Sequence, residues 1–227
     1  MRILPPVEPA GDPVKAHALG ERIANSVTHG VGLAASLVAL PLLVVSSLQR
    51  GDALHVTGAT IFGVSLVLLY AASTVYHSFP QTPSTRLLRV IDHSAIYVLI
   101  AGSYTPFMLG PLRGRLGYTL RAIVWAMAVV GIAMKTLRGF GRPALTAVPY
   151  VAMGWLSAVA AKPLIDRVGT AGFWWLLAGG LFYTGGVVFY ATDKRLRYGH
   201  AVWHLFVLAG STCHFFAVLW HSTRVTS

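Results

Sequence analysis

Residues 53–79, ALHVTGATIFGVSLVLLYAASTVYHSF, decide the fold, because this stretch contains no Asp, Glu, Lys or Arg. About 20 mostly apolar residues in a helix are enough to cross the hydrocarbon core of a bilayer. A water-soluble protein would be penalised for exposing such a stretch to water. The stretch therefore predicts a transmembrane helix and places the whole chain among integral membrane proteins.

Six more apolar runs flank this one along the 227-residue chain. The chain is 55% hydrophobic and only 11% charged, whereas soluble domains carry roughly 25% charged residues. The joining loops are brief, so consecutive helices are expected to be antiparallel neighbours in one bundle. The sequence predicts an all-α bundle of seven transmembrane helices in the plasma membrane, with the other runs at residues 27–48, 90–109, 118–134, 145–165, 171–191 and 200–221.

The chain before the first run is expected to lie outside the bilayer. Residues 1–16 are rich in proline and polar groups, which favours a mobile tail. Residues 17–27 are expected to form a short helix at the membrane surface. Residues 17–227 then make a single membrane domain.

Positive charge in the loops predicts the orientation, because cytoplasmic loops carry an excess of Lys and Arg. Seven of the 18 basic residues fall on the side of the C-terminus. The other eleven fall on the side of the N-terminus, and they are Arg2, Lys15, Arg22, Arg86, Arg89, Lys135, Arg138, Arg142, Lys194, Arg195 and Arg197. The sequence therefore predicts a cytoplasmic N-terminus and an external C-terminus.

The net charge of +11 is not interpreted as a nucleic-acid surface. The basic residues stand singly or in small groups between apolar runs, and no basic face with interleaved aromatic residues appears. Membrane lipids are the expected partners, and nothing in the sequence indicates an obligate protein partner.

Alternation of the helices brings distant polar residues to one depth, near the cytoplasmic side. His77 ends the second run, and His200 and His204 open the seventh. The spacing of four places His200 and His204 on one helix face, where they can chelate one ion. Three histidines and an open fourth position are typical of catalytic zinc. The pair alone is weak evidence for a metal, but with His77 and Asp92 at the same depth the sequence predicts a Zn²⁺ site at His77, His200 and His204.

Asp92 opens the third run, whereas the other acidic residues fall in the tail or near loops. An ionisable group at a membrane boundary is a functional candidate, and the alternative is a carboxylate favoured by the helix dipole. Ser73 precedes His77 by four residues and shares its face. The two residues are predicted as catalytic. Asp92 would take the proton of a zinc-bound water or orient that water. Ser73 would hydrogen-bond the water or the substrate oxyanion, although it can equally bond its own helix backbone.

Four further polar residues have no assigned role. Glu21, Asn25 and His29 are spaced by four and form one polar helical face, for which capping of the bundle by hydrogen bonds is favoured over catalysis. His214 lies about 15 Å deeper than His204 along the seventh helix. It is expected to be a hydrogen-bonded core histidine.

These motifs together resemble the hemolysin III family, the bacterial branch of the progestin and adiponectin receptor proteins in a superfamily with alkaline ceramidases. The resemblance rests on Glu21-x3-Asn25-x3-His29, Ser73-x3-His77, Asp92, residues 101–106 (AGSYTP) and His200-x3-His204. It implies a seven-helix bundle with a cytoplasmic N-terminus and zinc held by His77, His200 and His204. By the same resemblance, Asp92 holds the zinc-bound water and Ser73 lies near it. His93-Ser94-Ala95 departs from the receptor relatives, which puts the substrate in question.

Two functions of different classes follow. The first is a zinc-dependent hydrolase of amide (ceramide-like) or ester lipids. The second is non-enzymatic: a structural zinc in a membrane-homeostasis or sensor protein, or a lytic hemolysin. A pore would need a polar lining along whole helices, whereas the polar residues here gather at one end.

Overall fold

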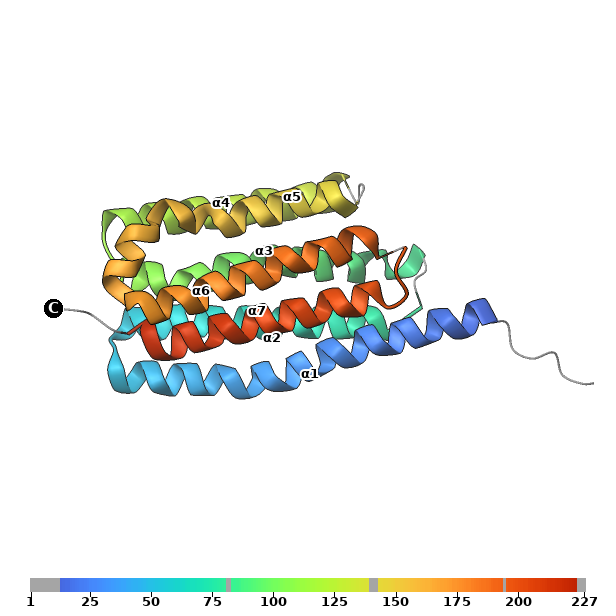
Figure 1. Cartoon of the computed structure of the whole chain (residues 1–227), viewed down its shortest axis with the longest axis horizontal. Helices are drawn as coiled ribbons and strands as arrows, with labels where there is room; N and C mark the ends of the chain where they lie inside the picture. The colour runs from blue at the N-terminus through green and yellow to red at the C-terminus, as the bar shows by residue number, and fades with distance from the viewer. Residues whose placement is uncertain (1–12, 81–82, 139–142, 194, 224–227) are drawn as a thin grey trace, which may run out of the picture.

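A computed structural model describes residues 13–80, 83–138, 143–193 and 195–223, and in this part of the chain it is helical throughout. Figure 1 shows long helices lying side by side with their axes nearly parallel. The elements are α1 (Pro13–Arg50), α2 (Ala53–Ser78), the 3₁₀ turn η1 (Pro83–Thr85), α3 (Arg86–Leu109), α4 (Arg115–Arg138), α5 (Pro143–Gly154), the 3₁₀ segment η2 (Trp155–Ala160), α6 (Ala161–Thr192) and α7 (Gly199–His221).

The apolar runs coincide with these helices to within a few residues. α2 begins at Ala53 because Asp52 caps it: its side chain accepts hydrogen bonds from the backbone N–H groups of Leu54 and His55. The predicted loop between the fifth and sixth runs is the break at Gly169, whose backbone (φ 76°, ψ 168°) is not helical. The fifth run accordingly comprises α5, η2 and the start of α6.

Length and composition qualify five stretches of the described chain to cross a membrane. They are Leu19–Arg50, Ala53–Ser78, Arg115–Leu137, Thr146–Thr192 and Gly199–His221. The fourth contains 47 residues and includes the break at Gly169. α3 is not among them, since polar residues such as Asp92 and His93 lower its hydropathy. A membrane bundle of helices is confirmed, whereas seven crossings and their direction remain predictions.

The first helix differs from its prediction. Residues 17–27 are not a separate helix, because α1 runs without interruption from Pro13 to Arg50. Nothing in this segment breaks the helical backbone, since Pro41 is the one proline inside α1. The predicted tail, residues 1–16, falls outside the described residues except for Pro13–Ala16, which begin α1.

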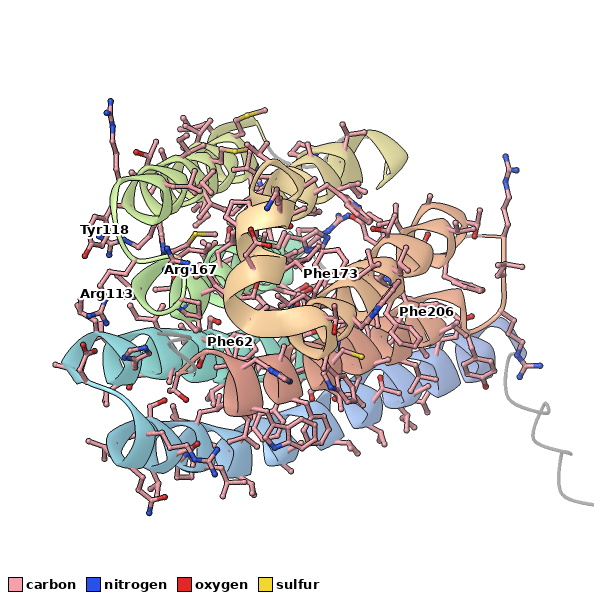
Figure 2. The ribbon with its side chains drawn as sticks, turned by 60° about the vertical axis from the view of Figure 1, so that its left-hand side comes forward. Phe62, Arg113, Tyr118, Arg167, Phe173 and Phe206 are labelled. Carbon is pink, nitrogen blue, oxygen red and sulfur yellow. The ribbon has the colours of Figure 1, made fainter. Side chains whose placement is uncertain are left out.

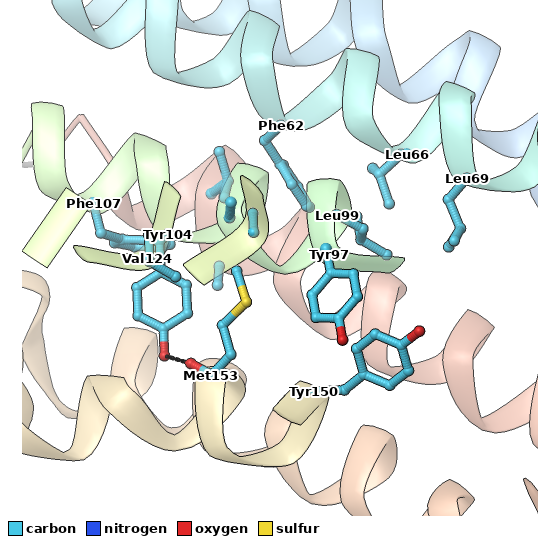
Figure 3. Close-up of a cluster of buried hydrophobic side chains, with 14 of the residues drawn as sticks. Phe62, Leu66, Leu69, Tyr97, Leu99, Tyr104, Phe107, Val124, Tyr150 and Met153 are labelled. Atoms are coloured by element: carbon cyan, nitrogen blue, oxygen red, sulfur yellow. Dashed lines mark hydrogen bonds between the residues drawn. The ribbon is translucent and has the colours of Figure 1, made fainter. Parts of the chain in front are cut away.

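Large apolar side chains fill the space between helices, and others face outward. Phe62 and Leu66 of α2 lie close to Leu99 of α3 in the buried cluster of Figure 3. Val38 of α1 and Val188 of α6 are exposed on the outer surface. Outward-facing apolar residues are what a lipid environment favours, since lipid tails are as apolar as the side chains.

Several polar groups inside the bundle are hydrogen-bonded between helices. The Tyr70 hydroxyl of α2 donates to Ser211 Oγ of α7 at 2.8 Å, and Tyr183 of α6 lies 3.0 Å from the same oxygen. The Tyr104 hydroxyl of α3 donates to the carbonyl of Met153 at 2.9 Å, at the point where α5 gives way to η2 (Figure 3). These bonds give the buried hydroxyl groups the hydrogen-bond partners that lipid hydrocarbon cannot provide.

One ion pair ties two loops together at the end of the bundle where α1 meets α2. Arg113, labelled in Figure 2, donates to both carboxylate oxygens of Asp52, at 2.7 and 2.9 Å. This bidentate bond holds the pKa of the Asp52 carboxyl well below its usual range. The contribution of the pair to stability is therefore present at neutral pH and is lost only as the pH falls through that lowered pKa.

Candidate metal centre

His77, His200 and His204 converge at the opposite end of the bundle, as their spacing predicted. Each offers one ring nitrogen, and these nitrogens lie within 4.8 Å of one another. His77 is in the last turn of α2, and the other two occupy the first turns of α7. His77 and His204 are buried.

The three rings suit a tetrahedral ion. Zinc binds imidazole nitrogen at about 2.0–2.1 Å, so its ligand nitrogens stand roughly 3.4 Å apart. The ring centroids are 5.0 Å apart for His77 and His200, 5.0 Å for His77 and His204, and 4.7 Å for His200 and His204. The ring nitrogens, which lie within 4.8 Å of one another, would reach that spacing through small changes in the side-chain torsion angles. The cluster can therefore hold a metal ion.

Hydrogen bonds at Nδ1 of His204 and of His200 determine which ring nitrogen of each residue is left to bind a metal. His204 Nδ1 lies 3.2 Å from the carbonyl oxygen of Asn25, which only accepts hydrogen bonds. It also lies 3.1 Å from Thr28 Oγ1, whose own hydrogen goes to the carbonyl of Ala24. Nδ1 of His204 therefore carries the proton, and Nε2 has a free lone pair.

Asp193 determines which ring nitrogen of His200 carries the proton. Its Oδ2 lies 3.3 Å from His200 Nδ1, so the carboxylate accepts a hydrogen bond from the Nδ1–H group and leaves the lone pair of Nε2 free. Sequence reasoning missed this residue, because Asp193 lies in the connection between α6 and α7 and was grouped with the loop acids. A carboxylate seven residues before a candidate ligand, across a turn, was the signal available.

The polar face of α1 holds the start of α7. Glu21 accepts a hydrogen bond from the backbone N–H of Tyr198 at 3.2 Å. Tyr198 has the left-handed conformation (φ 58°) and immediately precedes α7. Asn25 and Thr28 bond His204, as described above, and His29 stacks on the same ring. The expected hydrogen-bonded cap is therefore present in part: Glu21 bonds the start of α7 through its side chain, Asn25 bonds His204 through its backbone carbonyl, and His29 contributes a ring stack.

Asp92 and Ser73 lie beside the cluster, and both are buried. The Asp92 carboxylate is 3.5 Å from Nδ1 of His93, a residue that was left out of the predicted site. Ser73 Oγ has no hydrogen-bond partner within the described residues. Asp92 and Ser73 border the same cavity as His200 and His204. Their catalytic roles remain predictions.

That cavity has a volume of about 240 Å³ and a mainly apolar wall. It extends from the histidines toward the middle of the bundle, between α3, η2, α6 and α7. Its apolar lining includes Leu99, Phe107, Leu164, Phe173 and Val207. His214 borders its far part, with Nε2 3.3 Å from the carbonyl of Leu176. His214 is thus a hydrogen-bonded core histidine, as expected.

Comparison with known proteins relates this chain to hemolysin III proteins. Residues 18–215 match the family described as Haemolysin-III related. The chain is 46% identical to the "Hemolysin-3 homolog" of Bacillus subtilis (strain 168), over 90% of this chain and 96% of that protein. It is 47% identical to "Hemolysin-3" of Bacillus cereus, over 88% and 91%. It is 31% identical to the human "Monocyte to macrophage differentiation factor", over 87% and 83%. No solved structure matches.

The role of Asp193 is testable by its effect on metal affinity. Asp193→Ala should weaken zinc binding about 10–100-fold, because His200 loses the carboxylate that orients it. Competition with a chelator of known affinity measures this. Asp166→Ala is the matched control, since Asp166 pairs only with Lys162 on the surface. Equal zinc affinity in both variants would show that Asp193 does not support the site.

Proposed function

This chain belongs to the haemolysin-III related family, and from that premise we propose that it is a zinc-dependent hydrolase of amide (ceramide-like) or ester lipids. It is a multi-pass protein of the plasma membrane. One observation carries the proposal: three histidines able to hold a metal open onto an apolar cavity that Asp92 and Ser73 also border.

Zinc is the proposed ion because all three donors are imidazole nitrogens. Imidazole suits Zn²⁺, whereas Mg²⁺ and Ca²⁺ prefer oxygen donors. Three protein ligands leave a fourth position for water or substrate, in contrast to a structural site closed by four. When bound, zinc supplies a Lewis acid and a water of lowered pKa.

The residues of the chain divide the remaining tasks. Asp92 is buried beside the cluster, where it takes and returns a proton during cleavage. Ser73 Oγ, which has no partner among the described residues, donates a hydrogen bond to the oxygen of the scissile carbonyl. The apolar wall holds an acyl chain and keeps bulk water from the reacting groups.

Trp155 offers a route for such a substrate. It borders the cavity and is also 38% exposed on the outside of the bundle. Its indole N–H donates to Thr184 Oγ1 of α6 at 2.9 Å. We place the entry of the lipid here, between η2 and α6, where this one hydrogen bond would have to open to admit it.

A non-enzymatic role is the second candidate. His77 belongs to α2 and the other two histidines to α7, so an ion would also join two helices and stabilise the bundle. The relatives' name, hemolysin, suggests a lytic role as well. The mainly apolar wall of the cavity argues against a water-filled pore.

We further propose seven crossings, with the N-terminus in the cytoplasm and the C-terminus outside. In this arrangement α3 crosses inside the bundle, where neighbouring helices cover its polar residues, and the 47-residue stretch crosses twice by turning at Gly169. The metal centre then lies near the cytoplasmic face.

Reporter fusions at both termini test this topology. A reporter active only in the cytoplasm should respond at the N-terminus and stay silent at the C-terminus, because an odd number of crossings puts the ends on opposite sides. Activity at both ends would mean an even number of crossings.

The hydrolase itself is tested by Asp92→Asn with zinc in excess. Asparagine keeps the shape of the side chain but cannot take up a proton, so turnover of a ceramide-like amide or an ester lipid should fall about 10²–10⁴-fold. Lipid release by purified protein in bilayer-like micelles measures this, with Asp166→Asn as the surface control. Full activity in Asp92→Asn would remove Asp92 from the mechanism. A wild type that cleaves no such lipid would favour the structural role.

A further inference from the structure

His29 lies against the metal centre without belonging to it. It is 3% exposed, and its ring stacks on that of His204 with centroids 3.5 Å apart and planes 14° apart. On its other side it meets the edge of Tyr70, with centroids 5.1 Å apart. Packing from α2 and α7 therefore fixes the position of this ring.

The stack excludes His29 as a fourth ligand of the same ion. A metal lies close to the plane of each imidazole that binds it, because the nitrogen lone pair lies in that plane. Two nearly parallel rings 3.5 Å apart cannot both direct a lone pair at one point. The nitrogens available to one ion are accordingly those of His77, His200 and His204.

Both nitrogens of His29 are nevertheless buried with no hydrogen-bond partner among the described residues. Leaving a buried polar group unpaired destabilises the folded protein, and each such group needs an explanation. His29 borders the cavity together with Ser73, Asp92, His200 and His204. The ring therefore stands where the polar end of a bound lipid would lie.

We propose that His29 is a binding residue for a hydroxyl group on the substrate headgroup, adjacent to the scissile carbonyl. This inference rests on the proposed hydrolase and narrows its substrate class to acyl lipids whose amine or alcohol portion carries a hydroxyl, such as N-acyl amino alcohols. A neutral imidazole has one donor and one acceptor, and a hydroxyl can satisfy either. The remaining wall of the cavity is mainly apolar and suits the acyl chain.

Burial of the His29 imidazole also predicts that the site discriminates between headgroups with and without a hydroxyl. A headgroup that lacks the hydroxyl would occupy the site and leave the imidazole unpaired, so it binds more weakly. The loss of one such hydrogen bond corresponds to roughly tenfold to a hundredfold in affinity.

The test compares two lipids that differ by one hydroxyl, N-hexadecanoyl ethanolamine and N-ethyl hexadecanamide. Their dissociation constants are measured on the zinc-loaded protein by competition with a fluorescent acyl amide, so that turnover is not required. The informative variant is His29→Phe, which keeps the ring stacked on His204 and removes both nitrogens. Ser36→Ala is the matched control on α1, because the Ser36 hydroxyl is buried and bonds only the carbonyl of Leu33 in its own helix.

Wild type and Ser36→Ala should bind the hydroxyl lipid at least tenfold more tightly than its counterpart, and His29→Phe should bind the two equally while keeping its zinc. A preference retained by His29→Phe, or absent from wild type, overturns the proposal. Loss of zinc from His29→Phe overturns it too, because His29 would then be part of the metal centre. If His29→Phe does not fold, His29→Leu carries the same expectation. A wild type that binds with this preference but cleaves neither lipid contradicts the hydrolase and leaves the binding site standing.

Discussion

The packing of α1 against the first turns of α7 is the constraint on which the rest of the site depends. α7 contributes two of the three histidines, and its first turns are held from outside the helix. Glu21 fixes the backbone at Tyr198, while Asn25 and Thr28 fix the ring of His204. Without these contacts His200 and His204 would still share a helix face, and Asp193 would still bond His200, but the ring of His204 would no longer be held toward His77.

The same arrangement explains how so many polar groups persist in a membrane protein. Hydrocarbon offers no hydrogen bonds, so each polar group must be satisfied by protein or carry a function. Most are satisfied within the described chain, as with Tyr70, Ser211 and Tyr183. Others are not: His29 and Ser73, which border the head of the cavity, have no hydrogen-bond partner among the described residues. In the proposed hydrolase, a bound substrate supplies the partners of these two side chains.

Sequence patterns predicted the helices and the three histidines for separate physical reasons. Apolar runs report burial in lipid directly, so the limits of α2 and α7 followed to within a residue. Alternation of helices then brought His77 to the depth of His200. Continuity of α1 through residues 17–27 was not predicted, because an interfacial helix and an extended transmembrane helix share the same composition. Asp193 and the stack of His29 on His204 depend on side-chain geometry across helices, which no spacing along one chain encodes.

Metal content of the purified protein is the most direct measurement of the central claim. Elemental analysis should find one zinc per chain in wild type and in His55→Ala, whose histidine lies at the opposite end of α2 and pairs with Asp52. The His200→Ala/His204→Ala protein should hold less than about a tenth of that amount, because one remaining imidazole cannot retain the ion. Wild type without zinc, or undiminished zinc in the double variant, would contradict the account.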